Sequence, residues 1–162
     1  MDYLWSPWRY QYVTEIVKSA ECIFCEIASQ DSSLDEERYV LHRGRYNFVV
    51  LNLYPYTTGH VLVTPYAHVA TLAGLDAAGM TEMMLLTQKL EEALQTSYGA
   101  EGYNLGMNLG KCAGAGVDKH VHLHFLPRWS GDTNFMSVTS ETRVLPEDLR
   151  VTFQKLSPYF KP

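Results

Sequence analysis

Residues 120–126 read HVHLHFL, so a histidine alternates with an apolar residue along the whole segment. Successive side chains of a strand point to opposite faces, and this alternation predicts a strand with His120, His122 and His124 in a row on one face. The apolar residues between them then point into a core. The chain must therefore build a sheet around a strand whose two faces differ in chemistry.

Other segments supply partners for this strand. β-branched and apolar residues predict strands over 39–42, 46–52, 60–64 and 103–109. These strands are too close in sequence for crossover helices, which favours antiparallel pairing. We therefore expect a sheet of about five strands, which is the first half of an α+β fold.

Helical periodicity supplies the second half of the fold. Apolar residues at helical spacing, Met80, Met83 and Met84 among them, predict one long helix over 76–98 that stops at Gly99. Pro146 is expected to begin a C-terminal helix whose apolar face is Leu149, Phe153 and Leu156. The 162 residues fit a single domain, 1–162, with an aromatic-rich extension over 1–20 that we expect to pack across the domain or against a partner subunit.

Charge and hydropathy exclude several classes of protein. The net charge is −5 and no Lys/Arg cluster occurs, which argues against a nucleic-acid partner. No apolar run is long enough to span a membrane, and the first residues do not resemble a secretion signal. We therefore expect a cytoplasmic protein.

Three cysteines point to metal or redox chemistry. The three cysteines are Cys22, Cys25 and Cys112. Their odd number, without a secretion signal, argues against a disulfide framework. Cys22 and Cys25 form a CIFC pair, the usual spacing of two zinc ligands. His68 and His120 are candidates for the other two ligands. The alternatives are a redox pair, or a turn with two buried thiols.

The histidine row suits a nucleophile beside a phosphate site. Imidazole can serve acid–base catalysis, nucleophilic attack and metal binding near neutral pH. The alternative is that the three histidines are incidental residues of a polar strand face. The segment KCAGAG lies just upstream, and its glycines would let backbone amides approach an anion. Together these features predict attack by a histidine on a bound phosphate.

At HVHLHFLPRW the chain resembles the histidine triad (HIT) superfamily. LNLYPYTTGHVLVTPYAH is similar to the other motif of that family. The segments LWSPWR, CIFC, GYNLGMNLG and PRWSGDTNF resemble the branch that contains mycobacterial-type diadenosine tetraphosphate phosphorylases. The resemblance covers roughly residues 3–157 and implies a HIT-like fold.

The resemblance implies four catalytic residues. His122 corresponds to the nucleophile that attacks the α-phosphorus, and the backbone carbonyl of His120 fixes the tautomer of that ring. His124 corresponds to the residue that contacts the phosphate or bridging oxygen. His60 supports the triad.

Substrate contacts and a metal site are implied as well. Zinc-containing relatives have ligands at the positions of Cys22, Cys25, His68 and His120. Four protein ligands would make this a structural site, with no position left for a substrate. Mycobacterial-type phosphorylases lack these ligands. No organic cofactor is implied. Ala115 stands where close relatives have glycine, and its methyl group could crowd a phosphate or oppose a positive φ. The positions implied to bind substrate are Asn52, Asn108, Gly114, Ala115, Gly116 and Trp129.

These inferences combine into a double displacement on a nucleotide or dinucleoside polyphosphate. Neutral His122 forms a covalent nucleotidyl-histidine, which water resolves in a hydrolase and inorganic phosphate resolves in a phosphorylase. Alternatives are a nucleotide-binding HIT protein of weak or different activity, such as a phosphoramidase or a uridylyltransferase, and a hydrolase with catalytic zinc. The resemblance also implies a homodimer or homotetramer.

Overall fold

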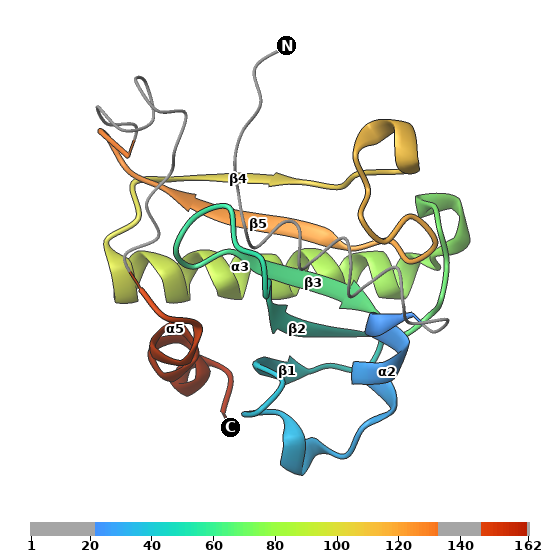
Figure 1. The fold of residues 1–162 in the computed structure, drawn as a ribbon, viewed down its shortest axis with the longest axis horizontal. Helices are drawn as coiled ribbons and strands as arrows, with labels where there is room; N and C mark the ends of the chain where they lie inside the picture. Colours follow the sequence, from blue (N-terminus) through green and yellow to red (C-terminus); the bar gives the residue numbers. More distant parts are fainter. Residues whose placement is uncertain (1–21, 133–146, 162) are drawn as a thin grey trace.

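A computed structural model of the chain describes residues 22–132 and 147–161. Five strands form one antiparallel sheet in the order β1-β2-β3-β5-β4, with the long helix α3 running across one face (Figure 1). This confirms the predicted α+β fold with one long helix and a C-terminal helix. The main elements are α2 (Ile23–Ser29), β1 (Val40–Arg43), β2 (Asn47–Leu51), β3 (Val61–Pro65), α3 (Ala77–Tyr98), β4 (Gly102–Gly106), β5 (Leu123–Arg128) and α5 (Leu149–Leu156).

The two faces of the sheet carry separate apolar clusters. Side chains alternate along β2 and β3, so neighbouring residues enter different clusters. Val49 and Val63 pack with α3 and α5, whereas Phe48 and Leu62 pack with α2. All these side chains are buried. The sheet is therefore covered on both faces, mainly by α3 on one and by α2 on the other.

Helix α3 begins and ends as its sequence indicates. The Asp76 carboxylate caps it by accepting from the backbone N–H of Gly79 (2.6 Å), and Gly99 ends it in the left-handed conformation (φ 59°). Met83 is buried in the core, but Met80 and Met84 are 39% and 51% exposed. Met80 and Met84 thus follow the helical spacing that predicted α3, but they lie off its buried stripe, which runs from Gly79 to Leu94.

The short helix α2 was not predicted, because CIFC alone gives no helical period. Arg43 of β1 holds its C-terminal end by donating to the carbonyls of Ile27 (3.1 Å) and Ala28 (3.2 Å) and to the carboxylate of Asp35 (2.9 Å). Phe24 and Ile27 point from α2 into the second cluster. Helix α2 is thereby fixed over the β1–β2–β3 side of the sheet.

Three element boundaries lie three residues from the sequence expectation. Strand β5 begins at Leu123, because its last pairing with β3 is Val63 with Leu123, and the carbonyl of Pro65 accepts instead from the His120 ring. Helix α5 begins at Leu149, where the Asp148 carboxylate caps it.

Pro146 and the extension 1–20 lie outside the described residues. Strand β4 ends at Gly106, three residues earlier than expected. Over 22–132 and 147–161, the helices are too short or too polar to cross a bilayer.

Candidate active site and metal centre

The histidines lie on the sheet face that α2 covers. His124 pairs with Leu62 across β5 and β3, and Leu62 belongs to the cluster packed against α2. Of His60, His122 and His124, only His124 is inside a strand, but the three rings form a continuous row: the centroids of His60 and His124 are 5.1 Å apart, and those of His124 and His122 are 4.8 Å apart. His122 thus lies beside His124 as expected, and His120 lies on the same side, because its ring and that of His122 both pack on Phe24 of α2.

His122 is held in one tautomer. Its Nδ1 lies 2.9 Å from the carbonyl oxygen of His120, which can only accept, so Nδ1 carries the proton and Nε2 keeps the lone pair. Burial lowers the pKa of His122, against a smaller opposing effect of this hydrogen bond. An unprotonated ring with a free Nε2 is the form that can attack phosphorus.

A relay through His60 fixes the opposite tautomer in His124. The backbone N–H of Tyr56 donates to Nδ1 of His60 (3.1 Å), so His60 carries its proton on Nε2 and donates it to Nδ1 of His124 (2.9 Å). Nε2 of His124 is therefore an N–H donor. Burial, followed by the charges of the neighbouring histidines, lowers the pKa of His60 to about 3 and that of His124 to about 4.

Asn52 and Tyr56 complete this corner of the site. The amide nitrogen of Asn52 lies 3.2 Å from Nδ1 of His60, and its oxygen accepts from the backbone N–H of Tyr54 (3.0 Å). The ring of Tyr56 stacks on His124 at 5.9 Å between centroids, with 19° between the planes. Tyr56 has no predicted role from the sequence, although it lies in the motif LNLYPYTTGHVLVTPYAH.

Four side chains, one of them that of His120, converge to form a candidate metal centre. The ligand atoms of Cys22, Cys25, His68 and His120 all lie within 4.8 Å of one another. Nδ1 of His120 is 3.3 Å from the Cys22 sulfur, and Nδ1 of His68 is 3.1 Å from the Cys25 sulfur. A tetrahedral zinc ion places such ligand atoms about 3.3–3.8 Å apart, so the cluster fits zinc.

The protonation of the cluster also suits a cation. Nε2 of His120 donates to the carbonyl of Pro65 (2.8 Å), which leaves the lone pair on Nδ1, the atom that faces the sulfurs. Burial and the neighbouring Cys22 raise the pKa of the Cys25 thiol. A bound cation would offset the free-energy cost of ionising the Cys25 thiol and would stabilise both thiolates.

Phe24 joins the two sites, a role that its sequence pattern does not predict. Its ring lies 4.8 Å from that of His122 and 5.3 Å from that of His120, measured between centroids. Phe24 is the third residue of CIFC, so the motif that supplies two thiols also supplies a wall of the histidine row. The aromatic residue between the two cysteines is the sequence feature that could have pointed to this role.

The glycine-rich loop precedes the histidine row. The backbone N–H of Gly114 donates to the carbonyl of Lys111 (2.9 Å), and that of Ala115 lies 3.4 Å from the carbonyl of Gly110. Gly114 needs its positive φ of 88°, but Ala115 does not, since Tyr39 alone has positive φ among the non-glycine residues described. Two of the expected phosphate-binding amides are thus engaged within the loop. Gly116 follows them, and Asn108 lies in the segment that leads to the loop.

Trp129 is not brought to the other site residues. It follows the end of β5, whereas His122 precedes the beginning of that strand, so about 20 Å of strand separates them. Its indole nitrogen donates to the carbonyl of Tyr98 at the end of α3 (3.1 Å). Within one chain, Trp129 ties β5 to α3.

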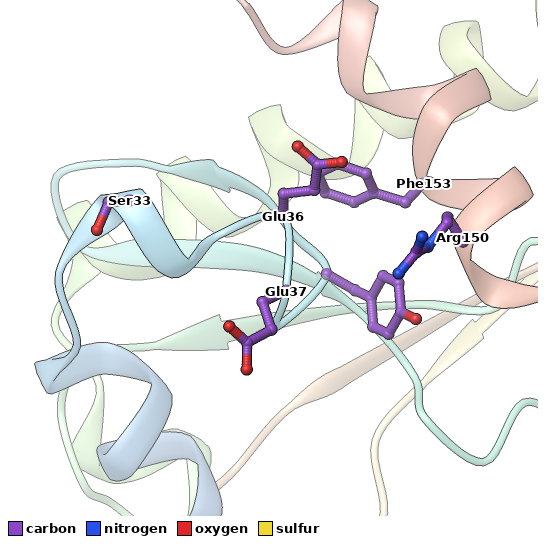
Figure 2. A pocket seen from close by; sticks show the side chains of 6 residues that line it. Ser33, Glu36, Glu37, Arg150 and Phe153 are labelled. Atoms are coloured by element: carbon purple, nitrogen blue, oxygen red, sulfur yellow. The ribbon is translucent and has the colours of Figure 1, made fainter.

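A separate cavity of ≈ 460 Å³ lies near α5 (Figure 2). It brings together two glutamates, one arginine and no histidine or cysteine, so it shares no residue with the histidine row. Its lining is Ser33, Glu36, Glu37, Tyr39, Arg150 and Phe153.

Comparisons with known proteins agree with this geometry. The HIT domain model matches residues 35–131. The chain is 38% identical over 162 residues to AP-4-A phosphorylase of Mycobacterium tuberculosis, covering 95% of this chain and 82% of that protein. It is 32% identical to a bis(5'-nucleosyl)-tetraphosphatase of Schizosaccharomyces pombe, over 57% of this chain and 50% of the relative. A zinc-bound histidine triad family protein from Mycobacterium smegmatis has a similar structure, with a TM-score of 0.68 and 28% identity over 86% of this chain and 92% of the other. The chain belongs to the HIT domain family.

Proposed function

We propose that this protein cleaves dinucleoside polyphosphates by transferring a nucleotidyl group through His122. The observation that carries the proposal is the hydrogen bond from Nδ1 of His122 to the His120 carbonyl, which leaves an unprotonated Nε2. Relatives named as an AP-4-A phosphorylase and as a bis(5'-nucleosyl)-tetraphosphatase support this class of substrate.

The reaction is a double displacement. Nε2 of His122 attacks the α-phosphorus, and an N–P bond forms while the P–O bond to the remaining phosphate chain breaks. The Nε2–H of His124 hydrogen-bonds the departing oxygen, since its Nδ1 is occupied by His60. An oxygen nucleophile then displaces the imidazole and regenerates neutral His122.

Inorganic phosphate is the acceptor we propose, because the relative aligned over 95% of this chain is named a phosphorylase. Diadenosine tetraphosphate would then give ADP and ATP. Water is the second candidate, since the engaged amides of Gly114 and Ala115 leave less of the loop for an additional anion. Products formed with and without phosphate decide between them: AMP and ATP indicate hydrolysis.

The experiment that tests the nucleophile is His122→Ala. We expect loss of turnover and of the nucleotidylated protein that mass spectrometry detects after brief mixing with substrate. The matched control is His42→Gln, a histidine of β1 that packs on Phe160 (5.7 Å between centroids) outside the row. Turnover by His122→Ala would refute the nucleophile. Tight nucleotide binding by the wild-type chain without any turnover would favour the binding-protein alternative.

We further propose that zinc occupies the Cys22, Cys25, His68 and His120 centre in a structural role. Four protein ligands leave no position for substrate, and reduced thiols suit a cytoplasmic compartment. Cys25→Ser should lower zinc content and thermal stability together. Instant loss of activity on chelation, with stability unchanged, would instead support catalytic zinc.

A homodimer is the assembly we propose. Strand β4 has β5 as its one partner among the described strands, and Leu105 on β4 is 55% exposed. Met84 and Leu85 form a further apolar surface on α3, 51% and 58% exposed. Exposed strand edges and apolar patches favour association. Light scattering of Leu105→Lys should show a smaller species than wild type, whereas Val151→Lys on α5 should not.

A further inference from the structure

We propose that Phe24 is a positioning residue for His122, and that the metal centre holds Phe24 in place. The inference rests on the proposed function, since it concerns the orientation of the nucleophile. In CIFC, the two thiols flank Ile23 and Phe24, so a metal bound by both thiols closes around this short stretch. The ring that contacts His122 thus belongs to the same turn as two metal ligands.

The contact between Phe24 and His122 is buried. Phe24 is 6% exposed and His122 is also 6% exposed, and their ring planes are tilted by 46°. The hydrogen bond to His120 fixes one edge of the His122 ring, but a single bond allows the ring to tilt about it. The packed rings of Phe24 and His124 restrict that tilt. The direction of the Nε2 lone pair therefore depends on where Phe24 lies.

Helix α2 cannot set that position by itself. It has seven residues, and helices of this length are marginal in isolation, so tertiary contacts must hold it. Arg43 anchors its C-terminal end. At its N-terminal end, Cys22 provides no side-chain cap, and its sulfur faces Nδ1 of His120 instead. The metal centre is thus the anchor nearest to Phe24.

His120 supplies a second connection to the same centre. Its Nδ1 faces the Cys22 sulfur, while its backbone carbonyl accepts from Nδ1 of His122. Both the hydrogen-bond acceptor of His122 and one of its packing partners are therefore tied to the four-ligand cluster. The cluster would affect catalysis only by orienting the His122 ring, and no reaction step would take place at the metal.

The test compares Phe24→Leu with Ile27→Val in the zinc-loaded protein. Both substitutions trim a buried α2 side chain of the same apolar cluster, and the ring contacts with His120 and His122 are made by Phe24. We expect Phe24→Leu to retain zinc and to lower kcat by about 10- to 100-fold with KM within about twofold, since small misplacements of reacting groups have effects of this size. Ile27→Val should stay within about twofold in both. Equal kcat values for the two variants would overturn the proposal.

A readout independent of turnover separates this inference from the proposed function. The ring nitrogen and proton resonances of His122, assigned by their loss in His122→Ala, report its environment directly. They should shift in zinc-loaded Phe24→Leu, and also when a chelator removes zinc from the wild-type chain. Unchanged His122 resonances in both cases refute the coupling. Shifted resonances with full turnover by His122→Ala would refute the proposed function and leave the coupling intact.

Discussion

The low pKa of His60 predicts a specific loss of stability in mild acid. Burial lowers this pKa from 6.5 to about 3, while the unfolded chain keeps the ordinary value. Below pH 6.5 the unfolded state therefore binds a proton that the folded state does not, so the free energy of unfolding falls as the pH falls. His60→Gln removes this titration and should flatten the dependence.

The magnitude follows from the same two values. One group with a pKa of 6.5 unfolded and about 3 folded lowers the free energy of unfolding by about 2 kcal/mol between pH 7 and pH 5. His60 is 1% exposed, so solvent screening does not reduce this figure much. The wild-type chain loses more in total, because burial also lowers the pKa of His124. The difference between variant and wild type isolates the contribution of His60.

Urea unfolding at pH 7, 6 and 5, followed by circular dichroism, measures this difference. His60→Gln is expected to be destabilised at pH 7, because it loses the hydrogen bond to His124, and this deficit should shrink by about 2 kcal/mol at pH 5. Gln154→His is the control, since it adds a histidine at an exposed position of α5. A deficit of His60→Gln that stays constant from pH 7 to pH 5 would refute a buried, neutral His60.

Two further substitutions test how the scaffold is held. The Glu82 carboxylate accepts from the three backbone N–H groups of 45–47 at 2.7–2.8 Å, so Glu82→Ala should cost about 2–4 kcal/mol in urea unfolding; an unchanged midpoint would contradict this. Gly59 has φ 76°, and a Cβ there would lie 3.0 Å from Leu94, so Gly59→Ala should cost about 1–3 kcal/mol. Gly102→Ala, with open space around its Cβ, is the matched control for thermal unfolding. Equal melting temperatures for the two alanine variants would argue against the clash.

Local periodicity predicted much of the fold. Alternation identified β5 and its two faces, and richness in β-branched and apolar residues identified β2 and β3, which are buried along their whole length. The stop at Gly99 was correct, since the chain there adopts the left-handed conformation that glycine tolerates. The start of β5 was not predictable, because it depends on where β3 stops offering partners.

The sequence predicted which residue types form the candidate site, but it did not predict all the contacts between them. Spacing placed His122 and His124 together, but the role of Phe24 depends on α2, whose position comes from tertiary contacts such as those of Arg43. Trp129 resembled a substrate residue by motif, yet strand length places it away from His122. Sequence patterns report the local period, whereas these distances arise only when the sheet is assembled.

The pairing of β5 with β3 gives the histidine-bearing face of the sheet little tolerance for insertions. His124 stands opposite Leu62, and its neighbours Leu123 and Phe125 belong to the interior beneath α3. Adding or deleting one residue inside this strand would turn the imidazole toward the α3 core and place a leucine or phenylalanine on the face that α2 covers. Length variation upstream, in the exposed loop over 110–116, leaves the strand in phase. A one-residue insertion therefore keeps His124 on its face when it falls in that loop between β4 and β5, and reverses the face when it falls inside the strand.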